Sequence, residues 1–128
     1  MRVVVESFDR RWNALRPFIK KTAANAARLL HLQGKYQVEI ILVGNNTMQK
    51  NVLAFPASKE MPRPDLKGKK ALGEIYLNPD RIRKETLEFA APQCGASLAH
   101  FGRGFCRPAL AYMLIHGFLH LLGYDHKR

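Results

Sequence analysis

Tyr36-Gln-Val-Glu-Ile-Ile-Leu-Val43 sets the architecture that we expect for this chain. The segment begins with alternation and ends continuously apolar, which is typical of a β-strand entering a covered sheet. Before it, the valine-rich residues 1–8 predict a short strand, and Asp9 is a candidate helix cap. Residues 10–33 carry apolar side chains spaced by three and four, which predicts one amphipathic helix ended by Gly34.

After residue 43, two further apolar runs predict strands, and two segments that contain an early proline predict helices. The runs are residues 51–55, an edge or neighbouring strand stopped by Pro56, and residues 71–77. The helices are expected from Asn78-Pro79-Asp80 to about residue 91 and from Pro108 to Gly123. Residues 57–70 form a basic loop. Strands that alternate with helices predict an α/β or α+β class.

Composition favours a single globular domain over residues 1–128 that binds a polyanion. The chain has 21 Lys and Arg against 10 Asp and Glu, a net charge of +11, and 47% apolar residues. Such an excess favours nucleic acid or an acidic membrane face as a partner. The sequence shows no signal peptide and no membrane span, and its two cysteines make no disulfide framework. We therefore expect a cytoplasmic protein with free thiols.

Three of the five histidines lie in His116-Gly-Phe-Leu-His-Leu-Leu-Gly-Tyr-Asp-His126. His116 and His120 are four residues apart on the last predicted helix, so both rings project from one face. Gly123 can end the helix and let His126 return as a third ligand. Three imidazoles with one open position describe a catalytic zinc site, with one Zn²⁺ per chain. Asp125 is a candidate to orient a ligand ring. We expect structural roles for His31 and His100.

This spacing is also that of metzincin proteases, which carry a glutamate after the first histidine as general base. Here that position is Gly117. A protease would need a carboxylate from elsewhere, with Glu74 or Glu60 as candidates. The residues identify no catalytic side chain, so the attacking group would be a zinc-bound water or, if the nucleic acid that the charge predicts is RNA, its 2′-hydroxyl.

The eleven-residue run closely resembles the signature of the YbeY family, the zinc-dependent endoribonucleases and ribosomal RNA maturation factors of bacteria. Weaker similarities extend over residues 45–50, 52–56 and 72–77 with Asp80-Arg81. The resemblance implies an α+β fold, which we expect to be a mixed sheet of about four strands packed with three to five helices, with the metal site at the C-terminal helix. It also implies zinc bound by His116, His120 and His126.

The activity that the resemblance implies is single-strand-specific RNA cleavage, in maturation of the 3′ end of small-subunit ribosomal RNA and in ribosome quality control. RNA, ribosomal RNA or the ribosome is the expected partner. Basic side chains would contact its phosphates. The candidates for this contact are Arg63, Lys67, Lys69, Lys70 and Arg103.

One departure from the family separates two hypotheses. Lys50 is followed at once by Asn51-Val52, so the family's arginine-bearing segment is missing here, and Asn51 and Ala54 replace its usual Asp and Ser. The leading hypothesis is a zinc-dependent endoribonuclease. The alternative is a catalytically weakened RNA- or ribosome-binding protein in which zinc is structural.

Overall fold

The computed structural model describes residues 1–32, 36–57, 70–85 and 107–123, and these residues form an α+β domain. A four-stranded mixed sheet has the order β1-β2-β4-β3. Strands β1, β2 and β4 are parallel, and β3 pairs antiparallel with β4 at the edge. The elements are β1 (Arg2–Ser7), η1 (Arg10–Leu15), α1 (Arg16–Leu29), β2 (Tyr36–Leu42), β3 (Val52–Pro56), β4 (Lys70–Leu77), α2 (Pro79–Glu85) and α4 (Arg107–Leu121).

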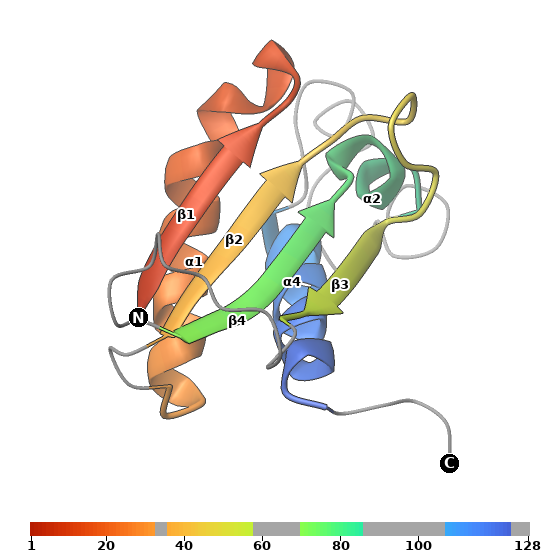
Figure 1. Cartoon of the computed structure of the whole chain (residues 1–128). Coiled ribbons are helices and arrows are strands. Elements are labelled where there is room, and N and C mark those ends of the chain that lie inside the picture. Colours follow the sequence, from red (N-terminus) through yellow and green to blue (C-terminus); the bar gives the residue numbers. More distant parts are fainter. Residues whose placement is uncertain (33–35, 58–69, 86–106, 124–128) are drawn as a thin grey trace.

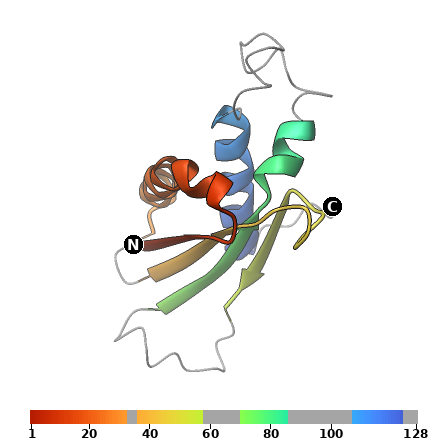
Figure 2. The same cartoon turned by 90° about the horizontal axis from the view of Figure 1, so that it is seen from above.

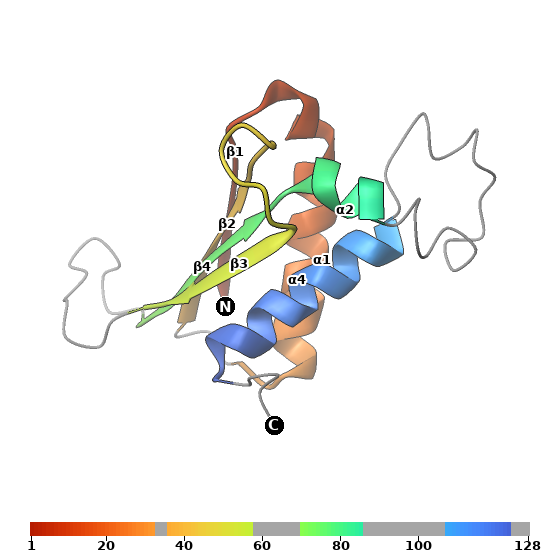
Figure 3. The same ribbon diagram turned by 90° about the vertical axis from the view of Figure 1, so that its right-hand side faces the viewer.

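The two long helices cover one face of the sheet (Figures 1 and 2). Helix α1 contacts β1, helix α4 contacts β3 and β4, and the two helices contact each other. Seen from the side, α1, α2 and α4 all lie on the same side of the strands (Figure 3). The expected sheet of four strands and its α+β class are therefore confirmed.

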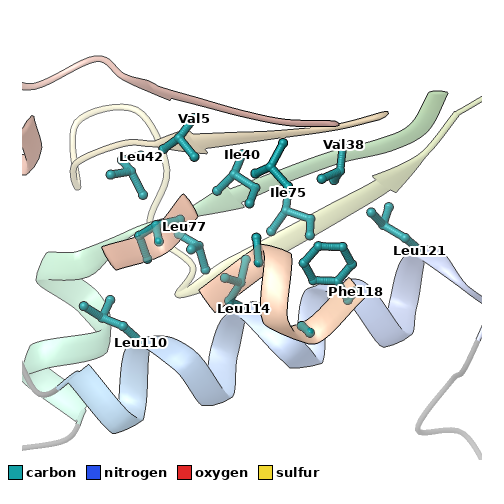
Figure 4. Packing of buried hydrophobic residues seen from close by; sticks show 14 of the residues in the cluster. Val5, Val38, Ile40, Leu42, Ile75, Leu77, Leu110, Leu114, Phe118 and Leu121 are labelled. Carbon is teal, nitrogen blue, oxygen red and sulfur yellow. The ribbon is translucent and has the colours of Figure 1, made fainter. Parts of the chain in front are cut away.

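The core lies between the sheet and these helices (Figure 4). Val38, Ile40 and Ile75 are fully buried on the strands, and Leu114 and Phe118 are fully buried on α4. Because side chains alternate along a strand, only every second residue reaches this layer. Each fully buried aliphatic or aromatic side chain contributes about 1.5–3 kcal/mol by leaving water.

The single helix expected over residues 10–33 is wrong at both ends. Its first turn is the 3₁₀ helix η1, which Asp9 caps as expected by accepting a 2.9 Å hydrogen bond from the Arg11 N–H. The α-helix begins only at Arg16, followed directly by Pro17. Proline has no N–H and its ring collides with the carbonyl four residues earlier, so an α-helix cannot run through this point.

The end of α1 lies at Leu29 and not near Gly34. Leu32 N–H donates to Ala27 O at 2.9 Å and His31 N–H donates to Arg28 O at 3.2 Å, while His31 has a φ of +58°. This pattern is a Schellman motif, which requires a left-handed residue and usually takes glycine there. His31 is exposed, so it is not part of the core. Its structural role is to end the helix.

Candidate metal and catalytic site

Helix α4 holds the histidine pair and packs against the sheet through its apolar side. Leu110, Leu114 and Phe118 are fully buried, whereas Tyr112 is 69% exposed, so the apolar stretch that begins the helix is only partly core. His116 and His120 are half-buried on the stripe that continues from Tyr112. The rings of Tyr112 and His116 are stacked, with centroids 6.5 Å apart.

The two imidazole rings converge, as the four-residue spacing predicts. The Nε2 atoms of His116 and His120 lie 2.9 Å apart, and the ring centroids lie 4.5 Å apart. This distance suits an N–H···N hydrogen bond between neutral rings. A tetrahedral zinc ion with two zinc–nitrogen bonds of about 2.0–2.1 Å needs its two nitrogens about 3.3 Å apart, so a shift of roughly 0.4 Å would let both atoms bind one ion. Two neutral nitrogen donors on one helix face are a donor set that zinc accepts.

Gly117 explains why this helix has no protease glutamate. A Cβ atom at Gly117 would lie 2.9 Å from Ile75 Cγ2 and 3.4 Å from Val52 Cγ2, so this side of α4 meets the sheet too closely for any side chain. The histidines lie on the adjoining, half-buried side of the helix. Glu74 does not replace the missing base, because strand alternation places it on the sheet face opposite Ile75 and the helices. Its Oε2 atom accepts a 2.9 Å hydrogen bond from the Tyr76 hydroxyl.

The chain turns after α4 at Gly123, as expected. Gly123 has a φ of +94°, and its N–H donates to His120 O at 3.1 Å. Asp125 and His126 lie outside the described residues, so the third ligand remains a prediction. Among the residues that the structure describes, no group of three or more metal-binding side chains is present.

The RNA-binding candidates are not tested by the structure. Arg63, Lys67, Lys69 and Arg103 lie outside the described residues, as do His100 and Glu60. Lys70 is the first residue of β4, but its side chain is not described. Their role in RNA contact stays a prediction.

Sequence reasoning missed a polar pocket of about 340 Å³ at the C-terminal ends of the parallel strands. Arg11 Nη2 lies 2.8 Å from Asp9 Oδ2 and 3.0 Å from Asp80 Oδ2, so one guanidinium joins the segments that follow β1 and β4. The hydrogen bonds from Arg11 lower the pKa of Asp9. The sequence predicts Asp9 and Asp80 only as residues at the starts of helices. Nothing in the sequence predicts that the ends of these two strands meet.

A buried asparagine fixes the loop beside this pocket. The Asn78 side chain is fully buried, and its Nδ2 donates to Asn45 Oδ1 at 2.9 Å and to Met48 O at 2.7 Å. Its Oδ1 accepts from Arg81 N–H at 3.2 Å, which confirms the expected cap of α2. Its polar atoms are thus paired, as buried polar groups generally are.

No helix in the described part of the chain has both the length and the apolar character that crossing a bilayer requires.

Comparison with known proteins gives one consistent family. The family model described as "Endoribonuclease YbeY" matches residues 5–128. A protein named endoribonuclease YbeY from Anaplasma marginale is 36% identical over 111 residues, which cover 87% of this chain and 55% of that protein. One from Lacticaseibacillus casei is 30% identical, covering 84% of this chain and 72% of that protein.

The chain therefore spans about half the length of the Anaplasma relative. Among solved structures, the solution structure of a Thermotoga maritima protein superposes with a TM-score of 0.53 at 23% identity, covering 98% of this chain and 75% of that one. This likeness supports the fold described above.

Proposed function

The chain belongs to the endoribonuclease YbeY family, and on this premise we propose that it is a zinc-dependent endoribonuclease that cleaves single-stranded RNA. We propose maturation of the 3′ end of small-subunit ribosomal RNA, and ribosome quality control, as its role in the cytoplasm. The observation that carries the proposal is the half-buried pair of Nε2 atoms 2.9 Å apart on α4.

His116 and His120 would hold the zinc ion, with His126 as the third ligand and Asp125 orienting a ligand ring. When bound, zinc would supply Lewis acidity toward a phosphate oxygen and lower the pKa of a coordinated water. The helix contributes by holding the two histidines four residues apart, so that both rings reach the same point before the ion binds. This fixed placement keeps the entropy cost of binding small.

The chain's remaining contribution is electrostatic. Its net charge of +11 attracts the phosphodiester backbone, so RNA binding should weaken steeply with salt. Among the described strand residues, no carboxylate lies on the inner sheet face, because Glu6, Glu39 and Glu74 alternate with the inward-facing Val5, Ile40 and Ile75.

The test compares His120→Ala with His31→Asn in the full chain. His31 is an exposed histidine with a positive φ, and asparagine tolerates that conformation, so this variant is a matched control. Elemental analysis should give about one zinc per chain for the wild type and the control, and much less for His120→Ala. The zinc-loaded wild type and control should cut single-stranded RNA but not the same sequence in a duplex.

Two outcomes would contradict the proposal. A folded wild-type chain that takes up no zinc would exclude the metal site. The second outcome is a chain that retains zinc and binds RNA without cutting it. If a chelator then lowers only the melting temperature of this chain, the RNA-binding alternative with structural zinc is favoured.

A further inference from the structure

A second, basic groove lies at the opposite edge of the sheet from β3. It has a volume of about 780 Å³ and runs between β1 and α1. β1 is the edge strand next to β2, with α1 beside it (Figure 1). Within the described part of the chain, the lining has three cationic side chains and no carboxylate. The lining residues are Met1–Val5, Asn13, Arg16, Pro17 and Lys20.

The backbone of β1 adds hydrogen-bond donors to this groove. Arg16 Nη2 donates to Val5 O at 3.1 Å, so that carbonyl points away from β2 and toward α1. By contrast, Phe8 N–H donates to Leu42 O on the β2 side. Because N–H and C=O of one residue point to the same side of a strand, the N–H groups of Val3 and Val5 face the groove.

We propose that this groove binds the phosphodiester backbone of single-stranded RNA, an inference that rests on the proposed function. Backbone N–H groups, arginine and lysine are the donors that phosphate oxygens accept in protein–nucleic acid complexes. Arg2, Arg16 and Lys20 are exposed and present this chemistry along one groove. An RNA that enters here would be held without base contacts, so the binding carries no sequence preference.

A free strand edge can also bind an added β-strand, and the position of Arg16 disfavours this second kind of ligand. Such a strand would need the Val5 carbonyl as an acceptor, and Arg16 already bonds it. A charged side chain across an edge strand is a common device against strand addition. An added strand would therefore have to displace Arg16 from this carbonyl, whereas an RNA phosphate would not.

The groove lies at the β1 edge of the sheet, whereas α4, which carries the histidine pair, contacts β3 and β4. β1 and β3 occupy opposite edges, three strand spacings or roughly 14 Å apart. At about 3.4 Å per stacked nucleotide, on the order of four nucleotides separate the two edges. An RNA longer than this can contact the groove while another part lies at α4, which packs beside α1 (Figure 2).

The test measures RNA binding in chelator, so that binding is separated from cleavage. Fluorescence anisotropy of a labelled, unstructured single-stranded RNA is recorded over a range of salt for the wild type, Lys20→Gln and Lys21→Gln. Lys21 is the matched control, because it is the neighbouring exposed lysine on α1 and does not line the groove. Arg2→Gln with Lys20→Gln forms the double variant, and melting temperatures verify that all variants fold.

Each lost phosphate contact should reduce the magnitude of the logarithmic salt slope by about 0.7 and the affinity at physiological salt roughly fourfold. The double variant should therefore lose about 1.4 from the slope, and Lys21→Gln should match the wild type. If Lys20→Gln and Lys21→Gln change the salt slope and the affinity equally, the proposal that the groove binds RNA is wrong. An unchanged slope with altered self-association in sedimentation would assign the edge to a second copy of the chain and overturn it too.

These outcomes separate the groove from the proposed activity. If the zinc-loaded wild type cuts RNA and the double variant keeps the full salt slope, the groove does not bind RNA, and the proposed endoribonuclease activity is still supported. If the slopes change as expected and no cleavage occurs, the function is wrong and the groove stands.

Discussion

Replacement of Gly73 by alanine should destabilise this protein more than any other single methyl addition at its described glycines. Gly73 has a φ of +145°, in a region that alanine rarely adopts. Its added Cβ would overlap the carbonyl oxygen of Phe55 on β3 and lie 2.7 Å from Leu121 Cδ2 on α4. The register shift that precedes Val38 in β2 places Gly73 opposite that residue, inside the sheet.

The magnitude follows from adding three effects. Backbone strain costs about 1–3 kcal/mol, and overpacking costs about 1–3 kcal/mol. Lower entropy of the unfolded chain returns about 0.4–1 kcal/mol. The net loss is about 3 kcal/mol of unfolding free energy, which lowers the melting temperature by roughly 10–15 °C in a domain of this size. Chemical denaturation and a thermal scan measure both quantities.

Two other glycines separate strain from collision. Gly123→Ala introduces strain alone, because φ is +94° and no atom of the described residues lies within 4 Å of the new Cβ. It should cost about 1 kcal/mol. Gly44→Ala introduces neither, since its nearest atom is Arg11 Nη2 at 3.5 Å, and it should be close to neutral. If Gly73→Ala costs no more than Gly123→Ala, the close approach of β3 and α4 to this backbone is not what requires glycine.

Three further changes test the site and the charges. Deletion of Asp125–Arg128 should abolish zinc retention because it removes the proposed third ligand; unchanged zinc content by elemental analysis would refute that ligand. The hydrogen bond to Glu74, together with burial, raises the pKa of Tyr76. The stability that this hydrogen bond contributes is therefore full below the ordinary tyrosine pKa and is lost as pH rises through the raised value. Glu74→Gln should lower this pKa in a spectrophotometric titration, and an unchanged titration would contradict the assignment. Because hydrogen bonds from Arg11 lower the pKa of Asp9, Asp9→Asn should reduce stability at neutral pH and match the wild type in acid; an equal deficit at both would count against the ion pair.

Periodicity predicted most of the sheet and the last helix, because burial on one face leaves a regular trace in the sequence. The strand at residues 36–42 and the edge strand that ends at Pro56 follow this rule. The stop of α1 could not be predicted in the same way. It depends on His31 adopting a left-handed conformation, which glycine usually supplies, so Gly34 was the more plausible but incorrect end point.

The candidate site likewise has a part that the sequence predicts and a part that depends on the tertiary fold. His116 and His120 converge because helix geometry alone fixes residues four apart, and this needs no knowledge of the tertiary fold. The ion pairs that join Asp9, Arg11 and Asp80 need the order of three parallel strands, which the sequence does not reveal. The basic groove needs the edge position of β1 for the same reason.

Helix α4 covers β3 and β4, although it follows all four strands along the chain. During synthesis, the apolar side of Ile75 and Leu77 therefore stays open to water until residues 107–121 have left the ribosome. A nascent chain interrupted before that point leaves these apolar strand residues exposed and is prone to aggregate. Because both imidazoles lie on this helix, the step that covers β3 and β4 is also the step that adds the histidine pair to the folded domain.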